Sequence, residues 1–226
     1  MTDVVAIDGP AGAGKSSVSR AVAHRLGYRY VDSGAMYRVI GFLAWEQGIA
    51  DDDVEALSRL CDAADIGFDE RDGAVRVLSG GRDVSREIRT AEAGQRASRI
   101  SAVPAVRARL VAEQRRMARA GSIVMEGRDI GTVVCPDAAL KIYLEAAPPE
   151  RARRRAAELG DRGESIDVER MTREIEERDQ RDAGRAHSPM RPAEDAVRID
   201  TTGLTLAEVV EAIYGLAAAR LPRLRG

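Results

Sequence analysis

The sequence contains few of the residues that build disulfide frameworks and metal centres. Among its 226 residues only Cys61 and Cys135 are cysteines, and only His24 and His187 are histidines. The members of each pair lie far apart in the chain, which argues against a disulfide framework and against a zinc site. Free cysteines are commonly buried, so we expect both thiols to lie in the core of a protein that folds in a reducing compartment.

Long apolar runs and an excess of one charge are also missing. No uninterrupted apolar stretch approaches the about 18 residues of a membrane span, and Met1-Thr2-Asp3 leads into an expected strand without a basic and apolar leader. The 35 basic and 37 acidic residues leave a net charge of −2, so no overall positive charge is offered to nucleic acid or to an anionic membrane. We therefore expect a cytoplasmic protein that binds neither nucleic acid nor membrane. No interface pattern stands out, so a monomer is expected.

Lysine is scarce as well. Lys15 and Lys141 are the only lysines among the 35 basic residues. Lys15 lies in Gly9-Pro10-Ala11-Gly12-Ala13-Gly14-Lys15-Ser16, which fits the phosphate-loop pattern of two spaced glycines followed by lysine and a hydroxyl residue. An apolar run at 4–7 predicts a buried strand before this loop, and the pattern at 17–26 predicts an amphipathic helix after it. This order favours a phosphate loop over a glycine turn that binds nothing.

The loop predicts a site for ATP. Glycines let successive backbone N–H groups point at a phosphate, and the following helix adds the positive end of its dipole. Lys15 supplies a charge for the β- and γ-phosphates, and the Ser16 hydroxyl can coordinate Mg²⁺ bound with ATP. Such a loop alone does not separate a kinase from a GTPase, a motor or a transporter ATPase. The expected ATP-binding residues are Gly9, Pro10, Ala11, Gly12, Ala13, Gly14, Lys15, Ser16 and Ser17.

Strands and helices alternate along the chain. Strands are expected at 4–7, 28–31, 122–125, 140–144 and 196–200, and the main helices at 17–26, 35–47, 91–101, 105–120, 150–159, 166–181 and 205–219. Gly121 is placed to stop the helix before the third strand. The alternation predicts an α/β fold with a five-stranded parallel sheet flanked by helices.

Two stretches interrupt this rhythm. Short alternating runs at 66–69 and 74–78, bounded by Arg71-Asp72-Gly73 and Ser79-Gly80-Gly81, predict a small antiparallel β insert. The charged helices after the fourth strand, broken at 160–163, predict a helical lid. We expect a single domain with a core at about 1–59, 103–150 and 182–226, an insert at about 60–102 and a lid at about 151–181. Such flaps suggest closure over a substrate.

Polar residues follow the second and third strands. In an open α/β sheet the carboxyl ends of the strands are where ligands bind, which draws attention to Ser33, Tyr37 and Arg38 and to the segment 126–131. Ser33 is also explained as the N-cap of the helix at 35–47, and Arg38 either binds an anion or is a solvated helix residue. For Glu126 two roles stay open, one near Mg²⁺ and one in an ion pair with a neighbouring arginine.

Five segments together resemble the bacterial cytidylate kinases, which are nucleoside monophosphate kinases of the phosphate-loop class. They span nearly the whole chain in the expected order. The resemblance implies a core, a monophosphate-binding insert and a lid. It also implies transfer of the γ-phosphate of ATP, with Mg²⁺, to CMP or dCMP, giving the diphosphate and ADP. The segments are Ile7-Asp8-Gly9-Pro10-Ala11-Gly12-Ala13-Gly14-Lys15-Ser16, Asp32-Ser33-Gly34-Ala35-Met36-Tyr37-Arg38, Glu87-Ile88-Arg89-Thr90, Gly127-Arg128-Asp129-Ile130-Gly131-Thr132-Val133-Val134 and Glu177-Arg178-Asp179-Gln180-Arg181-Asp182.

The resemblance also implies roles for single residues. Carried over by position, it puts Ser98, Arg107 and Asp129 on the cytosine base, although the first two would otherwise pass for helix-surface residues. A carboxylate such as Asp129 can accept from the exocyclic amino group of cytosine, where uracil presents an oxygen. Around the acceptor phosphate and sugar it implies Ser33, Arg38, Arg128 and Arg178, with Asp182 and Arg185 nearby. Lys15, Arg128 and Arg178 are the implied catalytic residues.

The chemistry of this reaction asks for charge and alignment. The nucleophile is a phosphate oxygen of CMP, whose second pKa near 6 leaves it mostly deprotonated at neutral pH, so no general base is needed. The lid arginines should include one or two that reach ATP, with the rest solvated. The turn Thr201-Thr202-Gly203 resembles the segment that lies against adenine. The lid arginines are Arg151, Arg153, Arg154, Arg155 and Arg162.

Two alternatives remain open. A kinase of another small acceptor, such as a different monophosphate or a shikimate-like alcohol, shares the loop, but an alcohol would need a base where this chain is rich in arginine. A nucleotide-gated regulatory GTPase should carry the guanine-reading Asn-Lys-x-Asp, and Lys141 is followed instead by Ile142 and Tyr143.

Overall fold

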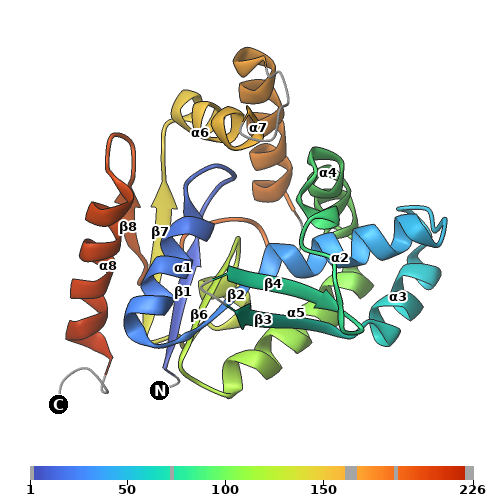
Figure 1. The fold of residues 1–226 in the computed structure, drawn as a ribbon, viewed down its shortest axis with the longest axis horizontal. Helices are drawn as coiled ribbons and strands as arrows, with labels where there is room; N and C mark the ends of the chain where they lie inside the picture. The colour runs from blue at the N-terminus through green and yellow to red at the C-terminus, as the bar shows by residue number, and fades with distance from the viewer. Residues whose placement is uncertain (1–2, 72–73, 161–166, 186–187, 222–226) are drawn as a thin grey trace. The chain divides into compact units, whose positions relative to one another are not determined.

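The computed structural model describes residues 3–71, 74–160, 167–185 and 188–221 (Figure 1). The chain divides into two compact units. The first unit comprises Met1–Tyr30 and Ala118–Gly226, and the second comprises Val31–Met117. Three features of the sequence analysis lie outside the described residues. They are part of the expected hairpin turn (Asp72 and Gly73), one lid arginine (Arg162) and the second histidine (His187).

A five-stranded sheet organises the first unit. Its strands are β1 (Val4–Asp8), β2 (Arg29–Asp32), β6 (Ile123–Gly127), β7 (Leu140–Glu145) and β8 (Val197–Asp200), in the order β2-β6-β1-β7-β8. The division between the units falls within β2, after Tyr30. β1 pairs in parallel with both β6 and β7, and Asp8 at its carboxyl end stands opposite Gly127 and Tyr143. The four residues Val4 to Ile7 are fully buried, as expected for a central strand covered on both faces. The predicted parallel sheet is confirmed.

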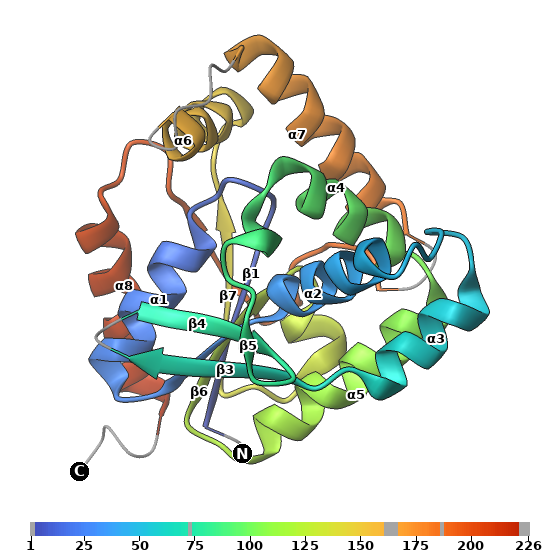
Figure 2. The ribbon, with the colours of Figure 1, turned by 45° about the vertical axis from the view of Figure 1, so that its right-hand side comes forward.

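Longer helices flank the sheet in the described part of the first unit. α1 (Lys15–Leu26) packs against β6 and against α8 (Leu206–Arg220), and Arg25 of α1 lies 3.9 Å from the centre of the Tyr214 ring. α8 begins with a capping box in which Thr205 and Glu208 satisfy each other's backbone N–H groups. α6 (Pro148–Gly160) and α7 (Val168–Ala183) pack side by side, as Figures 1 and 2 both show. These two helices lie where the sequence predicts a helical lid, and the name lid is kept for them below.

The second unit combines helices with a small antiparallel sheet. Its elements are α2 (Ser33–Glu46), α3 (Val54–Ala63), β3 (Ile66–Arg71), β4 (Ala74–Ser79), β5 (Arg82–Asp83), the 3₁₀ turn Glu87–Arg89, α4 (Ala91–Ile100) and α5 (Pro104–Arg119) (Figure 2). Strand pairing aligns Ile66 with Ser79 and Leu78 with Asp83. Gly80 and Gly81 both have positive φ (54° and 79°), the conformation that a tight two-residue hairpin requires. The antiparallel insert is confirmed.

A buried apolar cluster holds the second unit together. Met36 and Ile40 of α2 pack in it with Leu57, Ile88 and Ile100 from the following elements. Cys61 belongs to the same cluster, and burial raises the pKa of its thiol to about 11. Cys135, in the first unit, is buried as well, so the expected burial of both thiols is confirmed.

Three local features differ from the sequence-based expectation. α3 lies in a stretch for which no helix was predicted, although Asp53 caps it and Leu57 and Leu60 face the core. Ser33 does not cap α2: the cap is Asp32, whose carboxylate accepts from the Ala35 N–H at 2.9 Å. Aspartate and serine are both good caps and stand next to each other, and the extended backbone of Asp32 (φ −88°, ψ 97°) decides between them. A π-helical turn, Ile130–Val134, follows β6 and was not predicted.

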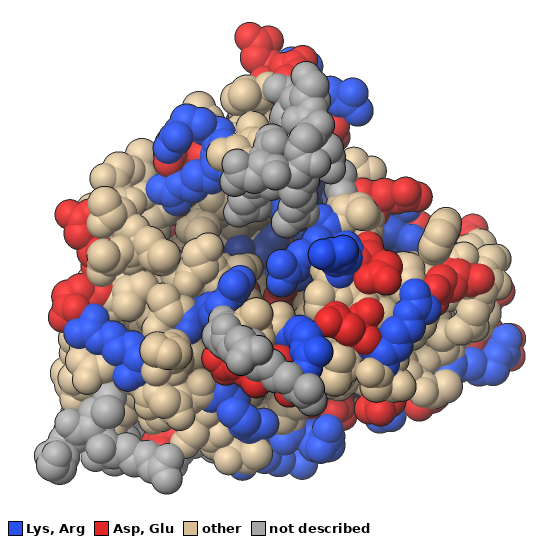
Figure 3. Space-filling model, viewed as in Figure 1, with Lys and Arg blue, Asp and Glu red and all other residues tan. Residues whose placement is uncertain are grey.

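Both signs of charge are spread over the face shown in Figure 3. On its described residues, Lys and Arg side chains alternate with Asp and Glu. None of the described helices has the length and apolarity needed to cross a membrane.

Candidate active site

The phosphate loop between β1 and α1 has a conformation that only glycine adopts readily. Gly9 and Gly12 have φ of 147° and 76°. A Cβ on Gly9 would lie 2.1 Å from the Leu144 carbonyl oxygen, and one on Gly12 would lie 2.9 Å from the Arg151 backbone oxygen. Gly14 precedes α1 and has no side chain with which to cap the helix, and the first turn of α1 holds no acidic residue. The N–H groups at this helix start are therefore available to a phosphate.

Lys15 lies buried at the base of the loop. Its ammonium group donates to the Pro10 carbonyl at 2.6 Å. Burial lowers its pKa to about 7, and the nearby charges of Arg128 and Arg178 act in the same direction, whereas Glu126 and Asp179 oppose them. Positive groups thus converge where the loop opens, and a bound anion would relieve their repulsion. Ser16 and Ser17 lie exposed in the first turn of α1.

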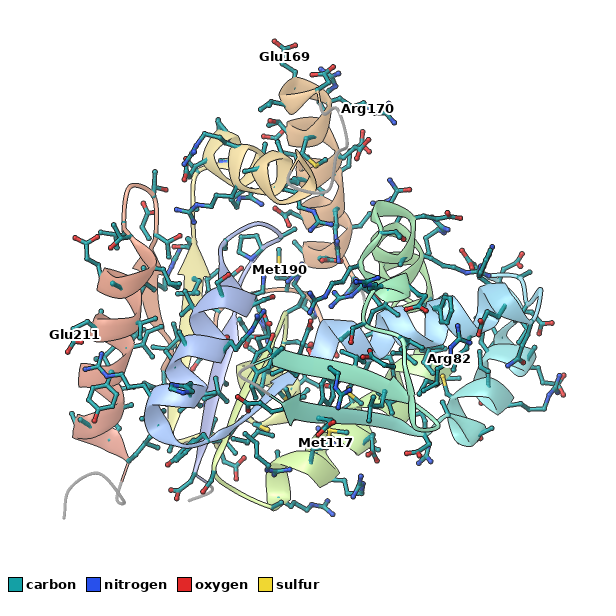
Figure 4. All side chains as sticks on the ribbon, in the orientation of Figure 1. Arg82, Met117, Glu169, Arg170, Met190 and Glu211 are labelled. Carbon is teal, nitrogen blue, oxygen red and sulfur yellow. The ribbon has the colours of Figure 1, made fainter. Side chains whose placement is uncertain are left out.

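The lid helices contact the loop through Arg151 and Asp179. The buried Arg151 guanidinium donates to the carbonyl oxygens of Ala11 and Ala146, each at 3.0 Å, and forms an ion pair with Asp179. Asp179 in turn accepts the Ala11 N–H at 3.2 Å. α7 therefore has an inner end at the loop and an outer end, where Glu169 and Arg170 project (Figure 4). The sequence analysis assigned no role to Asp179.

The other described lid arginines differ in their surroundings. Arg154 donates to the carbonyl oxygen of Thr201 at 2.7 Å and to its hydroxyl at 2.9 Å, and pairs with Glu150. This contact joins the lid to the turn 201–203. Arg153 is exposed and pairs with Glu150 on the surface, and Arg155 is half-buried. Arg151 and Arg154 are thus the lid arginines that the structure links to the loop and to this turn.

Three arginines surround Asp182 at the inner end of α7. The Arg128 Nε donates to this carboxylate at 3.0 Å, Arg185 forms an ion pair with it, and the Arg178 Nε lies 4.0 Å away. Burial by itself would raise the pKa of Asp182, but the charges of Arg128, Arg185 and Arg178 together lower it. We call Arg128, Arg178 and Arg185 around Asp182 the arginine cluster. Four of the residues predicted to bind CMP are brought together here.

Arg128 also joins the cluster to the phosphate loop, because its guanidinium donates to the Gly9 carbonyl at 3.0 Å. Next to it, Asp129 is buried and stands immediately before the π-helical turn. The buried Glu126 accepts a hydrogen bond from the Tyr30 hydroxyl. This contact matches neither of the two roles left open for Glu126 and excludes neither.

Asp8, at the end of β1, is a site residue that the sequence analysis missed. Its two carboxylate oxygens accept the N–H groups of Ile130 and Gly131, at 2.9 and 2.8 Å. Burial raises its pKa to about 6, although the two N–H bonds act to lower it. The sequence held one signal that could have identified Asp8: it is the charged last residue of an otherwise apolar strand.

The second unit places the other expected CMP residues on α2, α4 and α5. Arg38 pairs with Asp32 at 2.5 Å, and its side chain is only 23% exposed. Ser33, next to Asp32, is buried. Arg38 is therefore not a freely solvated helix residue.

Ser98 and Arg107 are buried, not surface residues. The Arg107 guanidinium lies 5.9 Å from the centre of the Tyr37 ring, which links it to α2. Among the described residues the buried Ser98 hydroxyl has no hydrogen-bond partner. A buried polar group of this kind calls for an explanation, and a ligand contact supplies one.

Comparison with known proteins decides the family. The sequence matches the model of the cytidylate kinase family over residues 5–219. The chain belongs to the cytidylate kinase family. It is 51% identical over 219 residues to a cytidylate kinase of Geobacter sp. strain M21, covering 96% of this chain and 94% of that protein. A cytidylate kinase of Citrifermentans bemidjiense is 48% identical over the same shares of the two chains.

A solved structure supports the fold in addition. A protein from Eubacterium ventriosum of uncharacterised function superimposes with a TM-score of 0.53 at 12% identity, covering 96% of this chain and 99% of that one. At this identity the likeness concerns the fold alone. The family resemblance inferred from the five segments is confirmed, and the roles of individual residues stay predictions.

Proposed function

We propose that this protein transfers the γ-phosphate of ATP to CMP or dCMP, giving CDP or dCDP and ADP. Besides the family, one observation carries the proposal. The Arg128 guanidinium donates hydrogen bonds both to the Gly9 carbonyl of the phosphate loop and to the carboxylate of Asp182, the centre of the arginine cluster. A loop suited to a triphosphate and a group of arginines suited to a second phosphate therefore share one residue.

The donor ATP is proposed to bind along the phosphate loop, from Gly9 to Ser17, with Lys15 on the β- and γ-phosphates. Arg151 and Arg154 are the lid arginines proposed to act on ATP, and the 201–203 turn is proposed to lie against adenine. The contacts of both arginines with the loop or with this turn support these assignments.

A Mg²⁺ ion fits the residues at the loop. The described residues contain no group of three or more His, Cys, Asp or Glu side chains arranged to hold a metal. Mg²⁺ does not require such a group, because it is commonly held by substrate phosphates, water and one or two protein oxygens. The exposed Ser16 hydroxyl at the start of α1 would be the protein ligand. Bound with ATP, Mg²⁺ would neutralise charge on the phosphate oxygens.

The residues proposed to bind the acceptor CMP are those that the family resemblance implies. Ser98, Arg107 and Asp129 are proposed to contact the cytosine base, and the unsatisfied Ser98 hydroxyl supports this assignment. The proposed contacts to phosphate and sugar come from Ser33, Arg38, Arg128, Arg178, Asp182 and Arg185. The Asp182 carboxylate is almost completely buried among the three arginines of the cluster. We therefore propose that Asp182 acts mainly by orienting these arginines.

Lys15, Arg128 and Arg178 are the proposed catalytic residues. Their part is to hold donor and acceptor phosphates in line and to stabilise the charge spread over the transferring group. The acceptor phosphate oxygen is already deprotonated at neutral pH, so no side chain has to remove a proton.

The remaining expectations stay proposals. We propose that the insert at about 60–102 and the lid at about 151–181 serve one kinase domain whose core is formed by the other residues. We propose further that the chain acts as a monomer in the cytoplasm, without nucleic acid or membrane as a partner. Sedimentation of the purified protein across a range of concentrations tests the monomer, and a rising mass contradicts it.

An acceptor panel tests the proposed function. ATP-coupled turnover is measured with CMP, dCMP, UMP, AMP, GMP and dTMP at equal concentration. We expect the two cytidine nucleotides to be phosphorylated fastest. A higher rate with a purine monophosphate, or equal rates with all six acceptors, would contradict the assignment.

A further inference from the structure

The carboxylate of Asp8 holds a turn that lies far away in the sequence. Asp8 ends the central strand β1, and Ile130, whose N–H it accepts, is 122 residues further along the chain. Each carboxylate oxygen takes one N–H, from Ile130 and from Gly131. Asp8 thus ties the carboxyl end of β1 to the segment that follows β6.

The turn held in this way directly follows Arg128 and Asp129. It is π-helical, with the Cys135 N–H bonded to the Ile130 carbonyl at 2.7 Å and the Val134 N–H bonded to the Asp129 carbonyl at 3.2 Å. Single π-helical turns are rare and often occur at functional sites. The first N–H groups of such a turn need partners from outside it, and Asp8 provides two. The direction in which residues 128 and 129 leave β6 is therefore fixed from β1.

A carboxylate is the side chain that suits this position. Two N–H donors face it, so two acceptor oxygens are required, whereas asparagine has one acceptor oxygen and one NH₂ donor. Burial disfavours the charge of this carboxylate and raises its pKa to about 6. Space is tight as well, since a Cβ on Gly131 would lie 3.4 Å from Asp8 Oδ2 and 3.3 Å from Lys141 Cδ.

We propose that Asp8 is a positioning residue for the acceptor side of the reaction, which aligns Arg128 and Asp129 with the phosphate loop by holding the Ile130 and Gly131 N–H groups. The inference rests on the proposed function, in which Arg128 binds the acceptor phosphate and Asp129 reads cytosine. Asp8 itself touches neither nucleotide in this account. Its removal should therefore affect CMP far more than ATP.

The test compares Asp8→Asn with wild type by steady-state kinetics. The substitution keeps the shape of the side chain and replaces one acceptor oxygen with a donor facing an N–H. We expect the KM for CMP to rise, and the preference for CMP over UMP to fall, each by between about tenfold and about a hundredfold, as small misplacements of reacting groups do. The KM for ATP should stay within about twofold, because glycine conformations and Lys15 shape the loop. A variant with equal losses for ATP and CMP, or with an unchanged CMP preference, overturns the proposal.

Two further variants keep the test decisive. Gly131→Ala places a methyl group against the Asp8 carboxylate and so disturbs the same contact from the turn. If Asp8→Asn does not fold, Gly131→Ala should show the same rise in the KM for CMP and the same loss of CMP preference. An unchanged CMP preference in Gly131→Ala also overturns the proposal. Asp53→Asn is the matched control, because this carboxylate also accepts a backbone N–H, that of Ala56 at 2.9 Å, but at the start of α3, where no residue of the proposed site lies. The control variant should keep wild-type kinetics. If it also lost the preference for CMP over UMP, the loss in Asp8→Asn would reflect a general loss of structure, which would contradict the proposal.

Asp129→Asn separates this inference from the proposed function. If Asp129 reads cytosine, this variant loses the preference for CMP whatever Asp8 does. A variant that keeps the preference contradicts the proposed function. Loss in Asp129→Asn together with no change in Asp8→Asn contradicts the positioning role alone.

Discussion

The phosphate loop and the arginine cluster belong to the same unit but are held in shape by different physical means. The loop depends on backbone conformation, with glycines at positive φ where a Cβ would clash with Leu144 or Arg151. The cluster depends on charge, with Arg128, Arg178 and Arg185 arranged around one carboxylate that is 2% exposed. One part is encoded in eight consecutive residues, and the other is assembled from the residue that follows β6, the last turns of α7 and the segment just after α7.

This difference bears on specificity. A loop that presents backbone N–H groups holds a triphosphate whatever the acceptor is. Arginines and carboxylates at set positions can distinguish one acceptor from another, because each polar group leaves an unpaired partner when the wrong base binds. The loop therefore identifies a nucleotide-binding protein, and the acceptor side defines which reaction it carries out.

The largest effect is expected on the donor side, from Lys15→Ala. Turnover should fall by at least about 10², the typical loss on removal of one electrostatic stabiliser. Arg116→Ala is the control, since it removes an exposed basic residue that pairs with Glu113 on α5. Single-turnover rates measure both variants. Near-normal turnover in Lys15→Ala would show that the loop is not the catalytic centre.

The next effect concerns the centre of the arginine cluster. Asp182→Asn leaves three arginines without their carboxylate, so we expect the free energy of unfolding to fall by about 3 kcal/mol at neutral pH. The KM for CMP should rise more than the KM for ATP. Urea unfolding and steady-state kinetics measure the two effects, and unchanged stability would contradict the role of charge in holding the cluster.

The pH dependence of that variant follows from the lowered pKa of Asp182. A carboxylate whose pKa is lower in the folded state than its ordinary 3.8 contributes stability above that pH and loses it as the pH falls further. The stability difference between wild type and Asp182→Asn should therefore be constant at neutral pH and shrink below about pH 4. A difference that grows on acidification would contradict the sign.

A smaller effect is expected from Arg38→Ala on α2. Loss of one charged hydrogen-bonding group to the acceptor phosphate should raise the KM for CMP roughly tenfold and leave ATP binding unchanged. Arg59→Ala, which removes an exposed partner of Glu55 on α3, is the control. Selective loss of ATP binding in Arg38→Ala would reverse the proposed placement of this residue.

The smallest effect is expected from Arg153→Ala on the lid. Arg153 is exposed and pairs with Glu150, three residues before it on α6, so kinetic constants should change by less than about twofold. Arg151→Ala, which removes contacts to Ala11 and Asp179, is the informative comparison and should weaken ATP binding. Equal effects of the two variants would contradict the distinction between the buried Arg151, which contacts the loop, and the exposed Arg153.

Much of the fold follows from local patterns in the sequence. The five strands, the hairpin turn at Gly80-Gly81 and the stop at Gly121 depend on residues close together in the chain, and all were predicted. α3 was missed although Asp53 and Leu57 carry a usable helix signal. The strand order β2-β6-β1-β7-β8 could not be predicted, because a run of apolar residues does not specify its neighbour.

The candidate site divides in the same way. The phosphate loop could be recognised from its spacing alone, whereas the acceptor residues were assigned through the family resemblance. Asp8 and Asp179 were missed because their partners, at Ile130 and Ala11, lie 122 and 168 residues away. Contacts over such distances are set by the packing of strands and helices, which no local pattern specifies.

The most direct test of the central claim measures kcat/KM for CMP and for UMP in wild type and in Asp129→Asn side by side. We expect wild type to prefer CMP by on the order of 10⁴, as sites built around a hydrogen bond to the substrate can. In Asp129→Asn the preference should collapse while the KM for ATP stays unchanged. A wild-type enzyme that uses CMP and UMP equally well, or a variant that keeps the full preference, would contradict the claim that the acceptor side defines the reaction.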